Sequence, residues 1–252
     1  MNKKTVYVAF STQKGGAGKT TLTVLVASYL HYVKGYNVAV IDCDYPQYSV
    51  VEMRKRDLNM VLKDPYYNGM AKEQFTRLNK KAYPVIAAKT ETALDEAAKL
   101  CEGGGTYDFI FFDLPGTINN AGVVHTLSAM EYIFTPITAD RVVVESSLRF
   151  ATVLNNTLIT TGKSSIRGLY MLWNMVDGRE KTELYDVYDG IMAELGLTVL
   201  KTVLPDSKRF RKEVSQEHRP QFKSTIFPTD RSLTKGGNVE ELTDEILTIL
   251  NR

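Results

Sequence analysis

Short apolar runs alternate along the chain with longer amphipathic stretches, and glycine, proline or polar residues separate them. Continuous apolar runs are typical of parallel strands that helices cover on both faces. They predict strands at 6–10, 37–42, 83–88, 107–112, 131–137, 168–177 and 197–200. Helical spacing predicts helices at 22–30, 92–100, 140–160 and 239–250, and two helical pieces within 50–81 that a loop at 64–69 separates. The alternation predicts one doubly wound α/β domain over residues 1–252, with a mainly parallel sheet flanked by helices.

The composition indicates a globular chain that needs no disulfide or structural metal. Hydrophobic residues make up 44% of its 252 residues, which is enough to form a full core. The net charge is only +2, so any affinity for nucleic acid must come from a local patch. Cys43 and Cys101 lie far apart in the sequence, and no apolar run resembles a signal peptide or a membrane span. We therefore expect a cytoplasmic protein.

A glycine-rich loop between the first strand and the first helix carries the clearest chemistry. Backbone N–H groups of such a loop, together with the start of the following helix, bind phosphate oxygens. Lys19 is placed to contact the β- and γ-phosphates of a nucleotide, and the Thr20 hydroxyl to ligate Mg²⁺. The sequence therefore predicts a phosphate and Mg²⁺ site whose residues are Gly15, Gly16, Ala17, Gly18, Lys19, Thr20 and Thr21.

Two other predicted strands end in acidic residues, at the sheet edge where ligands bind in doubly wound folds. One ends at Asp42, and another leads into Asp113-Leu114-Pro115-Gly116. An aspartate at the end of an apolar strand, downstream of a phosphate loop, is the Walker B arrangement, in which the carboxylate holds Mg²⁺ through water. Gly116 allows a backbone N–H to move towards the γ-phosphate.

The phosphate loop departs from the usual pattern, because Gln13 stands where the first glycine is expected and Lys14 adds a second lysine. In this respect the chain resembles the ParA/MinD family of ATPases with a deviant Walker A motif, and Gln13 resembles its ParA partition branch. The resemblance implies that Lys14 reaches across an ATP-bound homodimer to the partner's nucleotide. It also implies that Asp44 orients the attacking water and that Asp42 supports the Mg²⁺ shell. The family pattern D-x-D-P-Q is interrupted here by Tyr45.

The same resemblance implies an adenine site at the ends of the last predicted strands. Asn174 matches the family's adenine-contacting asparagine, and its amide can both accept and donate hydrogen bonds. Pro205 and Asp206 match the loop that lies near the base. For Asn174 the alternative is a plain cap on the following helix.

The most basic stretch of the chain is a candidate for DNA binding. Clustered cations are the electrostatic feature expected of proteins that bind the phosphate backbone. A solvated basic helix is the alternative, and the sequence leaves both open. The candidate DNA-binding residues are Lys208, Arg209, Arg211 and Lys212.

The resemblance implies a ParA-type ATPase that dimerises with ATP, binds DNA without sequence preference and positions plasmid or chromosome cargo. A stimulating adaptor protein, slow Mg²⁺-dependent hydrolysis and nucleoid association in the ATP state belong to that expectation. ParA-like proteins of conjugative elements are similar, so mobile-element cargo also fits. One alternative is a membrane-associated MinD-like ATPase, although the acidic residues of 240–245 argue against a membrane-binding helix. The second alternative is a P-loop enzyme that acts as a kinase or ligase on a small molecule.

Overall fold

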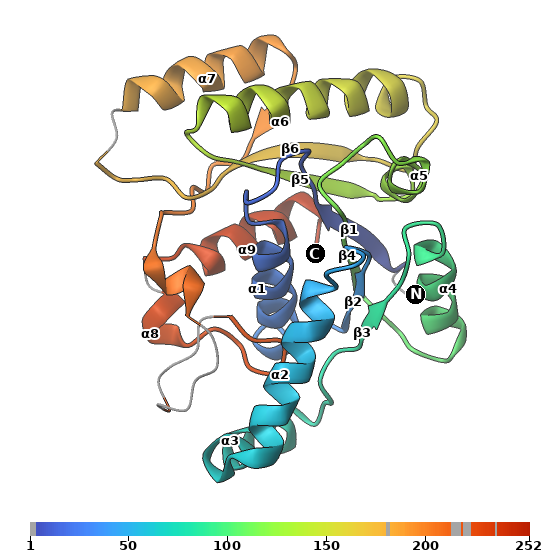
Figure 1. Ribbon diagram of the computed structural model, residues 1–252, viewed down its shortest axis with the longest axis vertical. Coiled ribbons are helices and arrows are strands. Elements are labelled where there is room, and N and C mark those ends of the chain that lie inside the picture. Colours follow the sequence, from blue (N-terminus) through green and yellow to red (C-terminus); the bar gives the residue numbers. More distant parts are fainter. Residues whose placement is uncertain (1–3, 180–181, 213–217, 219–222, 235) are drawn as a thin grey trace.

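The protein is described by a computed structural model that covers residues 4–179, 182–212, 218, 223–234 and 236–252. Seven parallel strands form one sheet in the order β3-β2-β4-β1-β5-β6-β7, with helices on both faces (Figure 1). The strands are β1 (Val6–Phe10), β2 (Val38–Asp42), β3 (Val85–Ala87), β4 (Phe109–Asp113), β5 (Tyr132–Ile137), β6 (Gly168–Trp173) and β7 (Thr198–Val199). The predicted α/β fold class is confirmed.

The helices were predicted less completely than the strands. They are α1 (Lys19–Tyr32), α2 (Ser49–Lys63), α3 (Pro65–Leu78), α4 (Ala93–Glu102), α5 (Ala121–Ser128), α6 (Arg141–Leu154), α7 (Thr182–Glu194), α8 (Arg231–Thr234) and α9 (Val239–Ile249). No residue range was predicted for α5, α7 or the short α8, although a helix after Asn174 was expected. A π-helical turn at Asn155–Ile159 continues α6, and a 3₁₀ turn spans Lys208–Arg211.

Alternate residues of each central strand point to opposite faces of the sheet and build two cores. Val6, Val8 and Phe10 of β1 pack against α1 and α9 on one face. Ala9 lies on the other face, in a cluster to which α4, α5 and α6 contribute. Helix α7 covers the β6–β7 end of the sheet, where Trp173 is buried. This sandwich fixes the carboxyl ends of β1, β2 and β4 along one edge, which is where the candidate site lies.

The prediction of a loop at 64–69 is wrong. Helix α3 begins at Pro65, directly after α2 ends at Lys63. Proline fits the first helical position because its missing N–H has no helical partner there, and Asp64 caps the helix by accepting from the Tyr66 N–H at 2.9 Å. Gly69 lies inside α3 and not in a loop. Because only Asp64 separates α2 from α3, the two helices form a hairpin that projects from the sheet (Figure 1).

Candidate functional site

The glycine-rich loop connects β1 to α1, as predicted, and two contacts hold its start. The Ser11 N–H donates to the Phe134 carbonyl oxygen of β5 at 2.9 Å, and the Thr12 and Ser147 hydroxyls are 2.9 Å apart in the interior. Gly16 and Gly18 have φ values of 81° and 93°, which residues with a side chain rarely adopt. The loop is therefore anchored at its base, and glycine is required at two of its turns.

The side chain of Asn174 ties the end of β6 to this loop. Its Nδ2 atom donates to the Ala17 carbonyl oxygen at 2.8 Å, and the residue is buried. Helix α7 begins only at Thr182, so Asn174 is not its cap. The alternative of a plain capping role is thereby excluded for that helix. Because Nδ2 is engaged, the amide orientation is set, and Oδ1 is the atom left to accept from a ligand.

The two loop lysines have different surroundings. The Nζ atom of Lys19 lies 3.4 Å from the Lys14 carbonyl oxygen and would be 3.0 Å from a Cβ atom on Gly116, so the phosphate loop and the segment after β4 are in close contact. Burial lowers the pKa of the Lys19 ammonium, while the carboxylates of Asp113 and Asp44 raise it. Lys14 is exposed and makes no ion pair with any residue in the described part of the chain.

Asp113 at the end of β4 is fully buried, and neither of its carboxylate oxygens has a hydrogen-bond partner of good geometry among the described residues. Burial raises the pKa of Asp113 to about 7; the Thr20 hydroxyl and Lys19 lower it, and Asp42 and Asp44 raise it. A buried carboxylate without a partner is costly, so this one is suited to a cation or to water bound to a cation. The residues present therefore fit Mg²⁺ next to Thr20.

The described residues contain no group of three or more His, Cys, Asp or Glu side chains that could hold a metal by themselves. Mg²⁺ commonly keeps several waters and binds through one or two protein groups together with phosphate oxygens. A metal here would therefore depend on a bound nucleotide for part of its coordination shell.

Asp42 has a structural task that the sequence did not reveal. Its Oδ2 atom accepts from the N–H groups of Val50 at 2.9 Å and Val51 at 3.0 Å, in the first turn of α2, and Oδ1 accepts from the Asp44 N–H at 3.3 Å. Burial raises the pKa of Asp42, whereas these backbone N–H groups lower it. Asp42 thus holds the segment that carries Asp44, which is partly exposed at the same sheet edge.

The inserted residue Tyr45 points out of this segment. It is 63% exposed, and its ring meets that of Tyr48 edge-on with centroids 5.8 Å apart. The insertion is therefore accommodated at the surface, and Asp44 still follows closely after the end of β2.

A cavity of about 270 Å³ adjoins the loop at the start of α1, and Asn174 and Asp206 contribute to its lining. Pro205 pairs with Val176 in a β-bridge, and the Asp206 N–H donates to the Val176 carbonyl oxygen at 2.8 Å. The three predicted adenine-site residues are thus brought together. The sequence did not indicate the other side chains that line this cavity, which are Leu22, Met175, Ser207, Phe210 and Lys223. Thr21, predicted as part of the phosphate site, also lines it.

Only part of the candidate DNA-binding residues can be placed. Lys208 and Lys212 are exposed, at the start of and just after the 3₁₀ turn. The side chains of Arg209 and Arg211 lie outside the described residues. Phe210 between them is turned inward and lines the 270 Å³ cavity. An aromatic residue inside a basic run was the one signal in the sequence that this segment has a buried side.

Comparisons with known proteins identify the family and the fold. Residues 8–220 match the family described as the CobQ/CobB/MinD/ParA nucleotide binding domain. A search of curated protein sequences gave no match. Within the described part of the chain no helix is both long and apolar enough to cross a membrane.

Several solved structures share the fold over nearly the whole chain. One is a putative plasmid partition protein from Borrelia burgdorferi B31 bound to AMPPNP, 17% identical with a TM-score of 0.64, covering 97% of this chain and 99% of that one. An ATP complex of Cyanothece McdA is 16% identical with a TM-score of 0.63 and coverage of 98% and 96%. The Pyrococcus furiosus cell division ATPase MinD is 18% identical with a TM-score of 0.61 and coverage of 98% and 100%.

The TM-scores and the coverage show a common fold, and the match of residues 8–220 shows the family. The chain belongs to the CobQ/CobB/MinD/ParA nucleotide-binding domain family and shares the fold of the solved ParA/MinD-type structures.

Proposed function

We propose that the protein is a ParA-type switch ATPase, which dimerises on binding ATP, binds DNA without sequence preference in that state and positions or partitions cargo. Plasmid, chromosome and mobile-element DNA are the cargo classes that fit. One observation carries the proposal: the loop holds two lysines, of which Lys19 is partly buried in its own phosphate site while Lys14 is exposed and has no ion pair among the described residues. A cation presented outward beside the phosphate site is suited to the nucleotide of a second subunit.

Within one subunit, the loop N–H groups from Gly15 to Thr21 and the Lys19 ammonium would hold the triphosphate. Mg²⁺ would be held by the Thr20 hydroxyl and, through water, by Asp113, and would reduce the negative charge on the β- and γ-phosphates. The close approach of Gly116 to Lys19 supports a role for its N–H near the γ-phosphate, because a side chain there would meet the Lys19 ammonium.

Hydrolysis requires a water aligned with the γ-phosphate. Asp44 is the residue we assign to orient it, because it lies at the sheet edge beside Asp113 and influences the pKa of both Asp113 and Lys19. Asp42 acts through its hydrogen bonds to the backbone. Its Oδ2 atom accepts from the Val50 N–H at the start of α2, and its Oδ1 atom accepts from the Asp44 N–H and so fixes the backbone of Asp44. A single polarising carboxylate is consistent with slow intrinsic turnover that an adaptor protein stimulates.

Adenine recognition is assigned to the 270 Å³ cavity. Asn174 would accept from the adenine amino group through Oδ1, since its Nδ2 already donates to Ala17. Pro205 and Asp206 border the same place. The cavity also links nucleotide to DNA binding, because Phe210 and Lys223 line it and both belong to the basic region that includes Lys208 and Lys212.

The alternative of a MinD-like membrane-binding helix has less support. The apolar side of α9 is already used, since Leu242 and Ile246 are fully buried against the core. Its first turn carries Glu240 and Glu241, which anionic lipid would repel.

The deciding experiment is duplex DNA binding with ATP, with ADP and without nucleotide, over a salt series. We expect binding with ATP only, at dissociation constants of about 10⁻⁴ to 10⁻⁶ M and with a steep loss of affinity as salt rises. Arg209→Glu with Arg211→Glu should remove it, whereas the matched pair Lys63→Glu with Lys72→Glu, on the α2–α3 hairpin, should not. Equal DNA binding in all three nucleotide states, or no DNA binding even at low salt, would overturn the DNA-binding proposal. The protein would then be an ATPase whose nucleotide cycle serves a process other than ATP-dependent DNA binding.

A further inference from the structure

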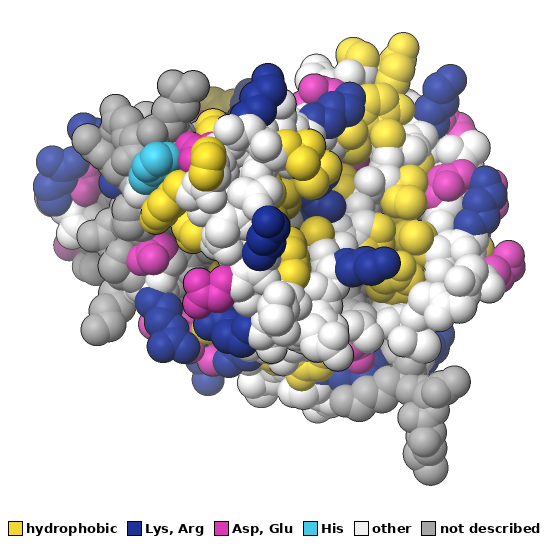
Figure 2. All heavy atoms as spheres, turned by 90° about the horizontal axis from the view of Figure 1, so that it is seen from below, with side chains coloured by type: hydrophobic (Ala, Val, Ile, Leu, Met, Phe, Trp, Pro, Cys, Tyr) yellow, Lys and Arg dark blue, Asp and Glu magenta, His cyan; other side chains and the backbone are white. Residues whose placement is uncertain are grey.

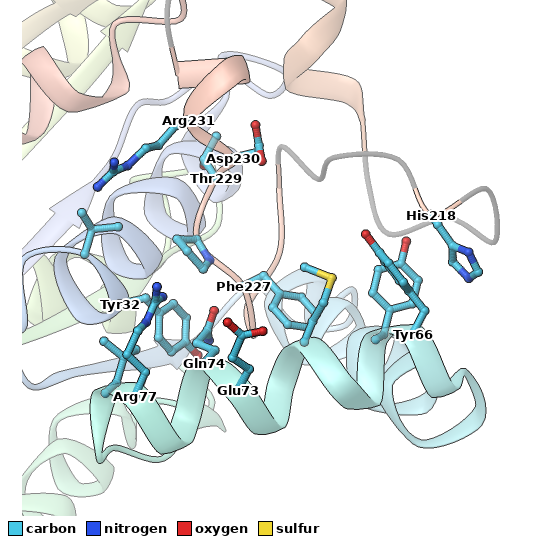
Figure 3. Close-up of a pocket in the computed structure, with 15 residues that line it drawn as sticks. Tyr32, Tyr66, Glu73, Gln74, Arg77, His218, Phe227, Thr229, Asp230 and Arg231 are labelled. Atoms are coloured by element: carbon cyan, nitrogen blue, oxygen red, sulfur yellow. The ribbon is translucent and has the colours of Figure 1, made fainter.

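A second cleft lies away from the phosphate loop. It has a volume of about 740 Å³ and is formed by α3, the end of α1 and residues 227–231 (Figure 3). Helix α1 runs from Lys19 to Tyr32, so Tyr32 in the cleft wall lies about 20 Å from the phosphate site. A nucleotide bound at the loop would not reach it.

The inner wall of the cleft is aromatic and well buried. Tyr32, Tyr67 and Phe227 are almost completely buried, and the rings of Tyr67 and Phe227 lie with centroids 6.1 Å apart. Met70 of α3 borders the cleft and is 37% exposed. The surrounding underside of the molecule mixes hydrophobic side chains with charges of both signs (Figure 2). The aromatic side chains of the inner wall favour a flat, apolar ring system of a ligand.

One buried polar group in the cleft has a fixed direction. Gln74 is only 7% exposed, and its Nε2 atom donates to the Ile226 carbonyl oxygen at 2.7 Å. The amide orientation is therefore set, and no residue in the described part of the chain donates to Oε1. A buried acceptor in a cleft wall is suited to a ligand N–H or O–H group.

Two guanidinium groups lie at the end of the cleft that Tyr32 closes. Figure 3 draws Arg77 and Arg231 there, from opposite walls. Both are exposed, and neither forms an ion pair with a described residue. Glu73 and Asp230 also border the cleft. Glu73 precedes Arg77 by one helical turn and Asp230 is the sequence neighbour of Arg231, so the cleft is mixed in charge, and the two guanidinium groups are the part of it that would attract an anion.

We propose that this cleft binds a planar organic anion that carries a hydrogen-bond donor on its ring system. The ring packs against Phe227 and Met70, its donor binds Oε1 of Gln74, and its carboxylate or phosphate lies between Arg77 and Arg231. The volume lies within the range of small-molecule sites. The site is independent of the proposed ATPase function, because it shares no residue with the phosphate loop or the 270 Å³ cavity.

Three related compounds test two features of this ligand class, the ring donor and the negative charge, by titration calorimetry. Indole-3-acetate has the planar ring, the N–H donor and the carboxylate; 1-methylindole-3-acetate lacks the donor, and tryptamine reverses the charge. We expect indole-3-acetate to bind with a dissociation constant of about 1 mM or tighter, in keeping with its size. The methylated compound should bind about tenfold more weakly, and tryptamine should not bind. Titrations with and without Mg²⁺-AMPPNP should agree, because the phosphate site is not involved.

Variants then place the binding in this cleft. Arg77→Glu with Arg231→Glu should weaken indole-3-acetate binding about tenfold or more. Lys63→Glu with Lys72→Glu, the same charge change at two exposed positions of α2 and α3 outside the cleft lining, should leave it unchanged. Circular dichroism confirms that each variant is folded. The proposal is overturned by the absence of binding up to several millimolar, by equal binding of tryptamine, by competition with AMPPNP, or by undiminished affinity in the folded arginine variant.

Discussion

A Cβ atom on Gly18 would lie 2.5 Å from Nδ2 of Asn174, closer than real Cβ contacts come. The same Nδ2 atom donates to the Ala17 carbonyl oxygen, so Asn174 cannot move away without losing that bond. The phosphate loop and the end of β6 are thus in direct contact at a point where only glycine fits. This contact joins the phosphate site to the cavity assigned to the base.

Gly18→Ala should therefore destabilise the nucleotide-free protein. The alanine would have to keep a φ near 93° and would press on Asn174, at a combined cost of about 1–3 kcal/mol in the free energy of unfolding. Chemical denaturation measures this. Gly15→Ala is the matched control, because a Cβ there meets nothing within 4 Å and should change stability by less than about 0.5 kcal/mol. Equal stability of the two variants would show that the contact is not tight.

Asp113→Asn should separate stability from activity. The carboxylate is buried without a good hydrogen-bond partner among the described residues, and burial raises its pKa to about 7, so a neutral amide removes a buried charge. We expect the nucleotide-free protein to gain about 1–3 kcal/mol of stability at pH 8, and Mg²⁺-dependent ATP hydrolysis to fall at least about a hundredfold. Thermal unfolding and a phosphate-release assay measure the two effects.

Asp186→Asn is the control for this change, since Asp186 is exposed on α7 and should affect neither quantity. Unchanged hydrolysis in Asp113→Asn would show that the residue does not act on the metal. A loss of stability would indicate that the carboxylate has a structural partner.

Lys14→Ala should still bind ATP but should not dimerise. Lys14 is exposed and has no ion pair with a described residue, so its removal should leave the subunit intact. The measurement is light scattering after size exclusion with ATP and Mg²⁺, beside a nucleotide-binding assay. Lys163→Ala, another exposed lysine, should dimerise like the unmodified protein. An ATP-dependent dimer of Lys14→Ala would assign the contact to other residues.

The sequence predicted the parts of the fold in which local pattern and burial agree. The run 6–10 is strand β1 with the same bounds, because a strand covered on both faces is apolar throughout. Helix α5 was missed because it is short and has little polar surface. Helix α7 was missed because Leu184, Val187 and Ile191 are exposed on it, which obscures the helical period.

The site divides in the same way. Lys19 and Thr20 come after the first predicted strand, and Asp113 ends a later one. Because parallel strands bring their carboxyl ends to one edge of the sheet, these residues could be expected to lie close together. Phe210 and Lys223 could not be placed at the base cavity, because they come from segments whose position depends on tertiary packing. The buried acceptor of Gln74 was beyond prediction for the same reason, since its partner Ile226 is 152 residues away in the sequence.

His31 should make the stability of the protein depend on pH in a defined direction. The ring is buried in α1, where Nε2 donates to the Lys81 carbonyl oxygen at 2.9 Å and Nδ1 accepts from the Val38 N–H at 3.4 Å, which is the pattern of a neutral imidazole. Burial lowers its pKa, and Lys80 and Arg54 lower it further against the raising effect of backbone carbonyls.

In the unfolded chain this histidine takes up a proton below a pH of about 6.5, whereas in the folded chain it does so only at lower pH. The unfolded state therefore binds more protons in that window, and the contribution of His31 to stability is lost as pH falls below about 6.5. Chemical denaturation at several pH values from about 5 to 8 should show a shallower decline for His31→Gln than for the unmodified protein. His125→Gln, the same change at an exposed position, should keep the original slope. Parallel slopes for all three proteins would mean that His31 is protonated alike in the folded and unfolded states.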